Sequence, residues 1–289
     1  MTTATLTPAV PSDADTAAPA RHAHPAGPGP SARGLLRSEW TKLVTLRSNL
    51  TALGATAAVL VVVGLVFAAI VGGVIADAGG EASEFANDPT GATLQGTLLA
   101  QLVVGVLGVL VITSEYATRT IRPTLTAVPR RLPVLAAKVV VVVAAAFPVL
   151  LAASFLAFGV GQVLIGNGDV SPASLGDPGV LRAIVGTAGY LTGVALMGLA
   201  AGALLRSTAA AVSTLVTIVF LLPGLTQLLL PSALRDNVAP YLPSGAADAF
   251  RTVAPGPELL STGAGLAVFA AWVVLPLVAA AVALQRRPV

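Results

Sequence analysis

The sequence has no cysteine, and its only two histidines, His22 and His24, lie near the N-terminus. These absences exclude a disulfide framework and thiolate metal sites, and they leave little material for a histidine-based zinc site. Charged residues are also scarce: they make up 10% of the chain, against about 25% in ordinary soluble domains. The sequence therefore predicts neither a metal site nor a soluble domain of ordinary composition.

Motifs of catalysis and nucleotide binding are missing as well. The chain has no Gly-x-x-x-x-Gly-Lys-Ser/Thr phosphate loop, no His-Glu-x-x-His pair and no Gly-x-Ser-x-Gly elbow. Residues 166–169 resemble the Gly-x-Gly-Asp pattern of intramembrane aspartyl proteases, but that chemistry needs a second buried aspartate besides Asp169. No membrane-length segment supplies one. We therefore expect no catalytic residue and no cofactor bound by this chain.

What the sequence does have is long apolar segments. It is 55% hydrophobic, with a mean hydropathy of +0.88. A helix needs about 20 residues to cross the hydrocarbon core of a membrane, and six segments are long enough: 51–76, 94–112, 139–165, 183–205, 209–230 and 263–284. Pro148, Pro223 and Pro276 predict kinks, and the short gap from Arg206 to Thr208 predicts a tight hairpin. The predicted fold class is an all-α membrane protein with six transmembrane helices.

Lysine and arginine residues indicate which side of the membrane each segment faces, because cytoplasmic loops are enriched in them. With the N-terminus inside, all but three of the sixteen fall on the cytoplasmic side; the other three are Arg182, Arg235 and Arg251. Most acidic residues fall on the outer side, which agrees. We therefore predict that both termini are cytoplasmic. This topology accounts for the sequence pI of 9.8 without nucleic-acid binding.

The chain divides into four predicted parts. Residues 1–33 lack periodic apolar positions and a signal-peptide core, so we expect a disordered cytoplasmic tail that is not cleaved. Residues 34–49 form an amphipathic interface helix, residues 50–285 the six-helix transmembrane domain, and residues 286–289 a second cytoplasmic tail.

The interface helix has one apolar and one polar face. At about 100° per residue, Leu36, Trp40 and Leu43 share the first, while Arg37 and Lys42 share the second. Glu39 departs from this pattern at the apolar margin. We expect the helix to lie along the inner membrane surface, with Trp40 at headgroup depth, and to contact a cytosolic partner. The alternative is a basic flank that only orients the first membrane helix.

The first cytoplasmic loop, residues 114–138, is the most charged segment between two membrane helices. It contains five basic residues and one acid, Glu115. With 25 residues it is longer than a turn requires, and it is therefore a candidate docking surface. The alternative is a solvated connector whose arginines only set the topology.

Several segments together resemble a known family. LRSEWTKL at residues 36–43 is followed by TLRS at 45–48, and GVLVITSEYAT at 108–118 by AVPRR at 127–131. These segments are similar to the permease subunit of bacterial ATP-binding-cassette (ABC) transporters of the type-2 export class. The resemblance implies a bacterial plasma-membrane protein with an interface helix, six membrane helices, a coupling helix in the first cytoplasmic loop and a re-entrant element before the last helix.

The same resemblance implies partners and contact residues. A separate ABC ATPase subunit would use ATP and Mg²⁺, and the permease would pair with a second copy or a similar permease within the lipid membrane. Residues 115–122 would be the coupling helix, and residues 37–47 the interface helix. The residues expected to contact the ATPase are Arg37, Glu39, Trp40, Lys42, Glu115, Tyr116, Arg119 and Arg122.

Two further segments leave structural alternatives open. Residues 231–262 are too polar to span the membrane and too apolar to be fully exposed to solvent. They predict either a re-entrant or interfacial helical pair or a capping loop. Gly189-x-x-x-Gly193 and Gly198-x-x-x-Gly202 permit close helix contact. That contact is either within the chain or between two copies.

Three functions compete at this point. Polar residues within the predicted spans are uncharged, which favours an amphiphilic, drug-like or lipid-like cargo over a proton relay. The favoured function is the permease subunit of an ABC exporter. The alternatives are a non-transporting membrane anchor or sensor for a cytosolic partner, and an ion-coupled carrier whose transport would persist without ATP.

Overall fold

The computed structural model describes residues 31–73, 87–117 and 131–286. These residues form helices joined by short loops, and no strand occurs among them. Six helices are long and apolar enough to cross a membrane: Arg47–Val71, Thr97–Tyr116, Leu132–Ile165, Val180–Leu205, Thr208–Leu229 and Thr262–Arg286. The chain is thus a multi-pass, all-α membrane protein. The predicted fold class is confirmed.

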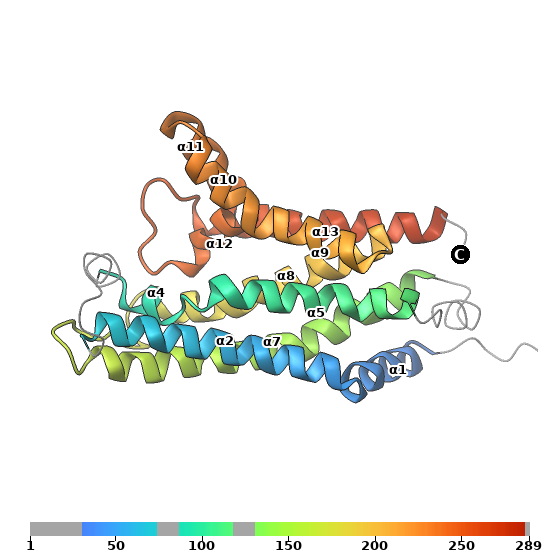
Figure 1. Ribbon diagram of the computed structural model, residues 1–289, viewed down its shortest axis with the longest axis horizontal. Helices are drawn as coiled ribbons and strands as arrows, with labels where there is room; N and C mark the ends of the chain where they lie inside the picture. The colour runs from blue at the N-terminus through green and yellow to red at the C-terminus, as the bar shows by residue number, and fades with distance from the viewer. Residues whose placement is uncertain (1–30, 74–86, 118–130, 287–289) are drawn as a thin grey trace, which may run out of the picture.

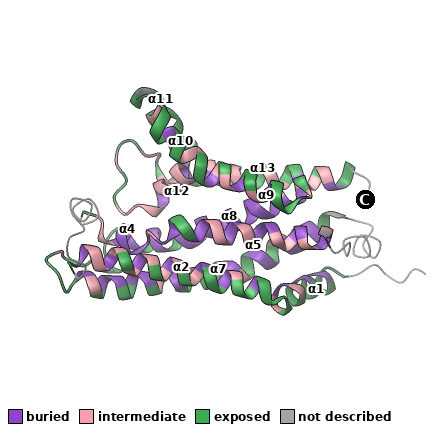
Figure 2. Cartoon of the chain, in the orientation of Figure 1, coloured by how far each residue is buried: buried purple, intermediate pink, exposed green. Residues whose placement is uncertain are grey.

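The long helices run roughly parallel to one another along the longest axis of the molecule (Figure 1). They are α2 (Arg47–Val71), α5 (Thr97–Ala117), α7 (Arg131–Ile165), α8 (Val180–Leu205) and α13 (Thr262–Arg286). Helix α8 lies at the centre, packed against α5, α7 and α13, and is the most deeply buried of them (Figure 2). The short helix α4 (Pro89–Thr93) precedes α5. The bundle core therefore forms around α8.

Glycines allow α8 to approach its neighbours closely. A Cβ atom on Gly198 would overlap the backbone carbonyl of Gly105 in α5, and one on Gly193 would lie 2.5 Å from the ring of Phe269 in α13. Gly202 faces Ile112 and Thr113 of α5. The spaced glycines of α8 were predicted to permit close contact either within the chain or between two copies. At these three positions the contact is within the chain.

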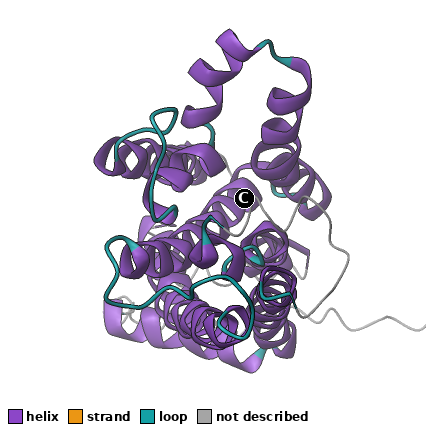
Figure 3. Ribbon diagram, turned by 90° about the vertical axis from the view of Figure 1, so that its left-hand side faces the viewer, coloured by secondary structure: helices purple, strands orange, loops and turns teal. Residues whose placement is uncertain are grey.

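The fifth membrane helix leaves the bundle partway along its length. It consists of α9 (Thr208–Val216), a π-helical turn η1 (Thr217–Leu221) and α10 (Leu222–Leu229). Pro223 has no N–H to donate and crowds the preceding turn, and a π turn is one way to accommodate such a break. Helices α10 and α11 (Ser232–Val238) project away from the other helices (Figures 1 and 3). The kink predicted at Pro223 thus takes the form of a π turn.

The predicted hairpin between the fourth and fifth spans is present. Arg206 adopts a left-handed conformation, with φ of 51°, and its N–H donates to the Gly202 carbonyl. Ser207 then caps α9 by accepting from the N–H of Ala210. Two residues are therefore enough to reverse the chain.

The segment between the fifth and sixth spans is a set of short helices. After α11 come a 3₁₀ turn, η2 (Ala239–Tyr241), and α12 (Pro243–Arg251), which packs against α8 and α13. Ala246, Ala247 and Phe250 of α12 are buried. The predicted helical pair is therefore present as α11 and α12, with α12 as part of the core. That this element re-enters the membrane stays a prediction.

Two predicted boundaries differ from the structure at the opposite end of the bundle. The helix predicted to lie at the interface is α1 (Ala32–Thr45), which ends at the extended residue Leu46, and residues 47–49 already belong to α2. Helix α5 continues to Ala117, so Glu115 and Tyr116 end a membrane helix instead of beginning a separate coupling helix. Residues 118–130, which include the rest of the predicted coupling helix, lie outside the described residues.

Candidate functional site

Four charged side chains meet where α1, α5 and α7 come together. The Nζ atom of Lys138 lies 2.7 Å from Oε2 of Glu39 and 2.8 Å from Oε1 of Glu115. The Nζ atom of Lys42 lies 2.7 Å from Oε1 of Glu39 and 3.0 Å from the same Oε1 of Glu115. We call these four residues the lysine–glutamate cluster. Each lysine bridges both glutamates, and the formal charges cancel.

The two lysines differ in their access to solvent. The side chains of Lys138 and Glu39 are each 3% exposed and that of Glu115 is 10% exposed, whereas that of Lys42 is 40% exposed. A buried charge is costly unless it is paired and hydrogen-bonded. Lys138 is thus the buried centre of the cluster, and Lys42 closes it on the accessible side.

The geometry of α1 explains why a glutamate faces inward. Leu35, Glu39 and Leu43 are buried at four-residue intervals, which places them on one face of the helix. Leu35 packs with Val134 and Ala137 at the start of α7. The buried face therefore differs from the predicted apolar face, since Leu36 and Trp40 are exposed beside it. The departure of Glu39 from the apolar pattern is explained by its two lysine partners.

The same ion pairs explain the helix boundaries. Glu115 can remain inside the last turns of α5 because Lys42 and Lys138 neutralise its charge. Lys138 lies seven residues into α7, which begins at Arg131 and not at the predicted residue 139. Residues of the cluster therefore lie near both ends of the predicted loop of residues 114–138.

The cluster shifts the pKa values of the two α1 residues in opposite directions. Burial disfavours the charged form of Glu39, but Lys138 and Lys42 outweigh it and hold the pKa of this carboxyl below its usual 4.5. Burial likewise disfavours charged Lys42, but Glu39 and Glu115 outweigh it and raise its pKa above 10.5. Both residues are therefore charged at neutral pH.

A cavity of about 380 Å³ opens beside the cluster. The cluster lines it together with apolar residues and with three further polar residues, Thr45, Asn49 and Ser114. The Oε2 atom of Glu115 is buried and receives no hydrogen bond from the described residues. One carboxylate oxygen of the cluster is thus left to accept a further donor.

The residues expected to contact an ATPase, as far as the structure describes them, lie in different surroundings. Glu39, Lys42 and Glu115 belong to the cluster, while Arg37 and Trp40 lie on the exposed side of α1. Tyr116 is half-buried, and the Arg206 guanidinium lies 5.7 Å from the centre of its ring. Arg119 and Arg122 lie outside the described residues. Contact of these eight residues with a partner stays a prediction.

The sequence interpretation missed the role of Lys138, which it used only to orient the loop. A signal was present: the chain has only two lysines among its sixteen basic residues, and both lie in this cluster. A lysine ammonium is a compact point charge that fits between two carboxylates, whereas the arginine fork is larger and planar. Both lysines of the chain thus occupy positions where a compact cation lies between two carboxylates.

Arginines make a second polar cluster at the other end of the bundle. Arg182, in the first turn of α8, donates to the carbonyls of Ala249, Thr252 and Val253 at 2.9 to 3.0 Å and to the Thr262 hydroxyl at 3.0 Å. It thereby fastens the end of α12 to α8 and α13. The sequence interpretation used Arg182 only as an outer charge.

Arg251 continues this second cluster towards α5. Its guanidinium donates to Asp248 at 2.6 Å and lies 4.8 Å from the centre of the Tyr190 ring. Tyr190 in turn donates to Gln101 of α5 at 2.5 Å. These contacts connect α12, α8 and α5 through side chains.

Comparison with known proteins does not identify a family for this chain. No protein-family model matches the chain, and no curated protein matches it. Among the described residues, no group of three or more histidine, cysteine, aspartate or glutamate side chains is placed to hold a metal ion. Inferences about function therefore rest on the residues and their geometry.

Proposed function

We propose that this chain is the membrane-spanning permease subunit of an ABC exporter and is driven by a separate ATPase subunit. The observation that carries the proposal is the position of the lysine–glutamate cluster. Glu115 and Lys138 lie near the two ends of the predicted loop of residues 114–138, three positions before residue 118 and eight after residue 130. A partner that binds this loop would therefore act directly on the ion pairs that join α1, α5 and α7.

The physical requirement for coupling is an element with two discrete arrangements. Ion pairs between charged side chains can exchange partners, and Glu115 retains one oxygen without a hydrogen bond from the described residues. A cation brought by the loop or by the ATPase would compete for that oxygen and loosen α1 from α5 and α7. The resemblance of residues 36–48 and 108–131 to type-2 export permeases supports the same function.

The buried polar residues of the spans bear on the cargo. Gln101, Ser154, Gln162 and Thr187 are buried and uncharged, and most of them bond to carbonyls or side chains of their own bundle. Such a set suits an amphiphilic, drug-like or lipid-like cargo better than a proton relay. The working unit that we propose is a pair of permease subunits in a bacterial plasma membrane, with both termini cytoplasmic.

The test is purification of the tagged full-length chain from its native membrane in mild detergent. We expect a second polypeptide with a phosphate-loop motif to co-purify and to hydrolyse ATP in a vanadate-sensitive manner. The double charge reversal Arg119→Glu with Arg122→Glu should remove that ATPase. The control reverses two cations of the C-terminal tail, Arg286→Glu with Arg287→Glu, and should retain it.

Two outcomes would contradict the proposal. If no ATPase co-purifies with the unaltered chain but another cytosolic protein does, the membrane anchor or sensor is favoured. If transport persists without ATP and collapses with the proton gradient, the chain is an ion-coupled carrier.

A further inference from the structure

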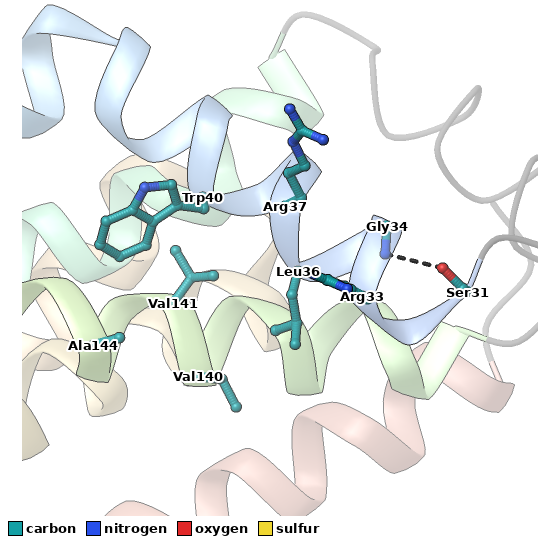
Figure 4. Close-up of a pocket in the computed structure, with 9 residues that line it drawn as sticks. All are labelled: Ser31, Arg33, Gly34, Leu36, Arg37, Trp40, Val140, Val141 and Ala144. Atoms are coloured by element: carbon teal, nitrogen blue, oxygen red, sulfur yellow. Dashed lines mark hydrogen bonds between the residues drawn. The ribbon is translucent and has the colours of Figure 1, made fainter.

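A groove lies between the exposed side of α1 and the start of the apolar part of α7. Its volume is about 690 Å³, and Figure 4 shows the residues that line it. They are Ser31, Arg33, Gly34, Leu36, Arg37 and Trp40 from the N-terminus of α1 onward, with Val140, Val141 and Ala144 from α7. Figure 4 places the Trp40 ring over Val141. The wall supplied by α7 is entirely apolar.

Two arginines that form no ion pair with the described residues flank this groove. Arg33 and Arg37 are exposed, lie one helical turn apart and form no salt bridge with the described acidic residues. The other two charged residues of α1 after Arg33, Glu39 and Lys42, are both bound within the lysine–glutamate cluster. Helix α1 thus holds a neutral set of charges within the bundle and carries two arginines on its exposed side, beside the groove.

The groove lies at the boundary between membrane and water. The span that contains Val140 has 34 residues, or about 51 Å of helix, whereas the hydrocarbon core is about 30 Å thick. The excess length allows the first turns of α7, which pack on α1 and include the charged Lys138, to stand outside the hydrocarbon. Trp40 is 43% exposed, and tryptophan side chains favour the headgroup region. Val140, which is 52% exposed, begins the part of α7 that lipid chains can reach.

We propose that this groove binds one anionic phospholipid, with its phosphate between Arg33 and Arg37 and an acyl chain along Val140 and Ala144. The apolar wall of α7 favours a hydrocarbon occupant, and the two guanidinium groups, which form no ion pair with the described residues, favour a negative one. A zwitterionic phospholipid carries a cation that would face the same arginines. Phosphatidylglycerol has the phosphate without that cation, so charge complementarity selects it.

The proposal does not depend on the ATPase. It assigns Arg37 and Trp40 to lipid, in place of the contact with an ATPase that their sequence context suggests. Glu39 and Lys42 keep their positions in the cluster. A lipid bound here would rest on α1 and α7 together and would therefore stabilise their contact.

Trp40 provides a local probe of this groove. The chain has only two tryptophans, so the substitution Trp272→Phe leaves Trp40 as the only one. The full-length variant is placed in phosphatidylcholine nanodiscs with increasing fractions of phosphatidylglycerol whose acyl chains are brominated, because bromine quenches nearby tryptophan emission. The reference series uses brominated phosphatidylcholine. If Trp272→Phe fails to fold, the signal of the unaltered chain minus that of Trp40→Phe gives the same quantity.

We expect Trp40 to prefer brominated phosphatidylglycerol over brominated phosphatidylcholine by at least about five-fold, the factor for one basic side chain at an anionic surface. The double variant Arg33→Gln with Arg37→Gln should reduce this ratio to about one. The matched control, Arg47→Gln with Arg286→Gln, removes two exposed arginines at the same end of the helices (Figure 1) and should keep the preference.

Three results would each overturn the proposal. Equal quenching by the two lipids would show an ordinary lipid-facing surface and would leave Arg37 and Trp40 for a protein contact. A preference that survives Arg33→Gln with Arg37→Gln would place the anionic lipid elsewhere. A preference lost equally in the control would show attraction to the total charge of this end of the protein.

Discussion

The two ends of the helix bundle are fastened by different chemistry. At the α1 end, two lysines and two glutamates pair with one another across three helices. At the α12 end, Arg182 donates to three backbone carbonyls and a hydroxyl. A backbone carbonyl cannot titrate or move independently of the backbone, whereas a charged side chain can do both. We therefore expect the contacts between helices at the α1 end to be able to rearrange and those at the α12 end to stay in place.

The largest effect that we expect comes from Lys138→Met. This change leaves the buried carboxylates of Glu39 and Glu115 with Lys42 alone, and removing one partner of a buried ion pair costs about 3 to 5 kcal/mol. Denaturant unfolding in detergent measures the loss in the free energy of unfolding. Lys42→Met is the matched control: that lysine is 40% exposed, and its loss should cost about 1 kcal/mol. Equal losses for the two variants would show that burial does not set the strength of the cluster.

The next largest effect that we expect is at the α12 end, where Arg182 binds backbone carbonyls. Arg182→Gln removes a fork that binds carbonyls of Ala249, Thr252 and Val253, and hydrogen bonds to a charged group are each worth about 1.5 to 3 kcal/mol. We expect a loss of about 2 to 4 kcal/mol in the free energy of unfolding. Arg182→Lys should recover little of it, because one ammonium group lacks the planar fork. Full recovery by lysine would contradict the geometry described for this end.

The pH dependence of stability should distinguish the two ends. The pKa of Glu39 is lower in the folded chain than its usual 4.5, so its stabilising contribution is complete above pH 4.5 and is lost as the pH falls below that value. The pKa of Lys42 is raised above 10.5, so its contribution is complete below pH 10.5 and is lost as the pH rises further.

The measurement for this prediction is the unfolding midpoint between pH 3 and pH 8. Glu39→Gln should lower the midpoint at neutral pH and reduce its fall below about pH 4.5. Asp236→Asn, at an exposed carboxylate, should leave the acidic fall unchanged. An acidic fall of the same size in Glu39→Gln and the unaltered chain would show that the cluster does not cause it.

The smallest effect that we expect is at an exposed ion pair. Arg235 and Asp236 approach to 3.6 Å in α11, with side chains 37% and 59% exposed. Pairs of this kind contribute about 0 to 1 kcal/mol. Arg235→Gln should therefore leave the free energy of unfolding nearly unchanged, and a loss as large as that of Arg182→Gln would remove the distinction between buried and exposed arginines.

The sequence predicted the six membrane helices because their signal is local: each is a long apolar run, and its type does not depend on its neighbours. The hairpin at Arg206 was predictable for the same reason. Glu39 was recognisable as an exception to the apolar face, but its partners were not, because Lys138 lies 99 residues away along the chain. Only the folded chain brings them together.

The α12 end was harder still to predict. The acceptors of Arg182 are backbone carbonyls, which every residue has, so no pattern of side chains indicates them. The face of α1 that packs within the bundle was not predicted either, since Leu35, which packs with Val134 and Ala137 of α7, was assigned to neither face of the helix. That difference leaves Leu36 and Trp40 at the groove beside α7.

The central claim is that the buried ion pairs of Lys138 hold α1 in place against α5 and α7. Because the chain has no cysteine, spin labels at Thr41→Cys in α1 and Gln285→Cys in α13 report a single distance by pulsed electron resonance. We predict one narrow distance distribution for the otherwise unaltered chain, a broad or shifted one with Lys138→Met, and little change with Lys42→Met. A distribution that stays narrow and unmoved with Lys138→Met would contradict the claim.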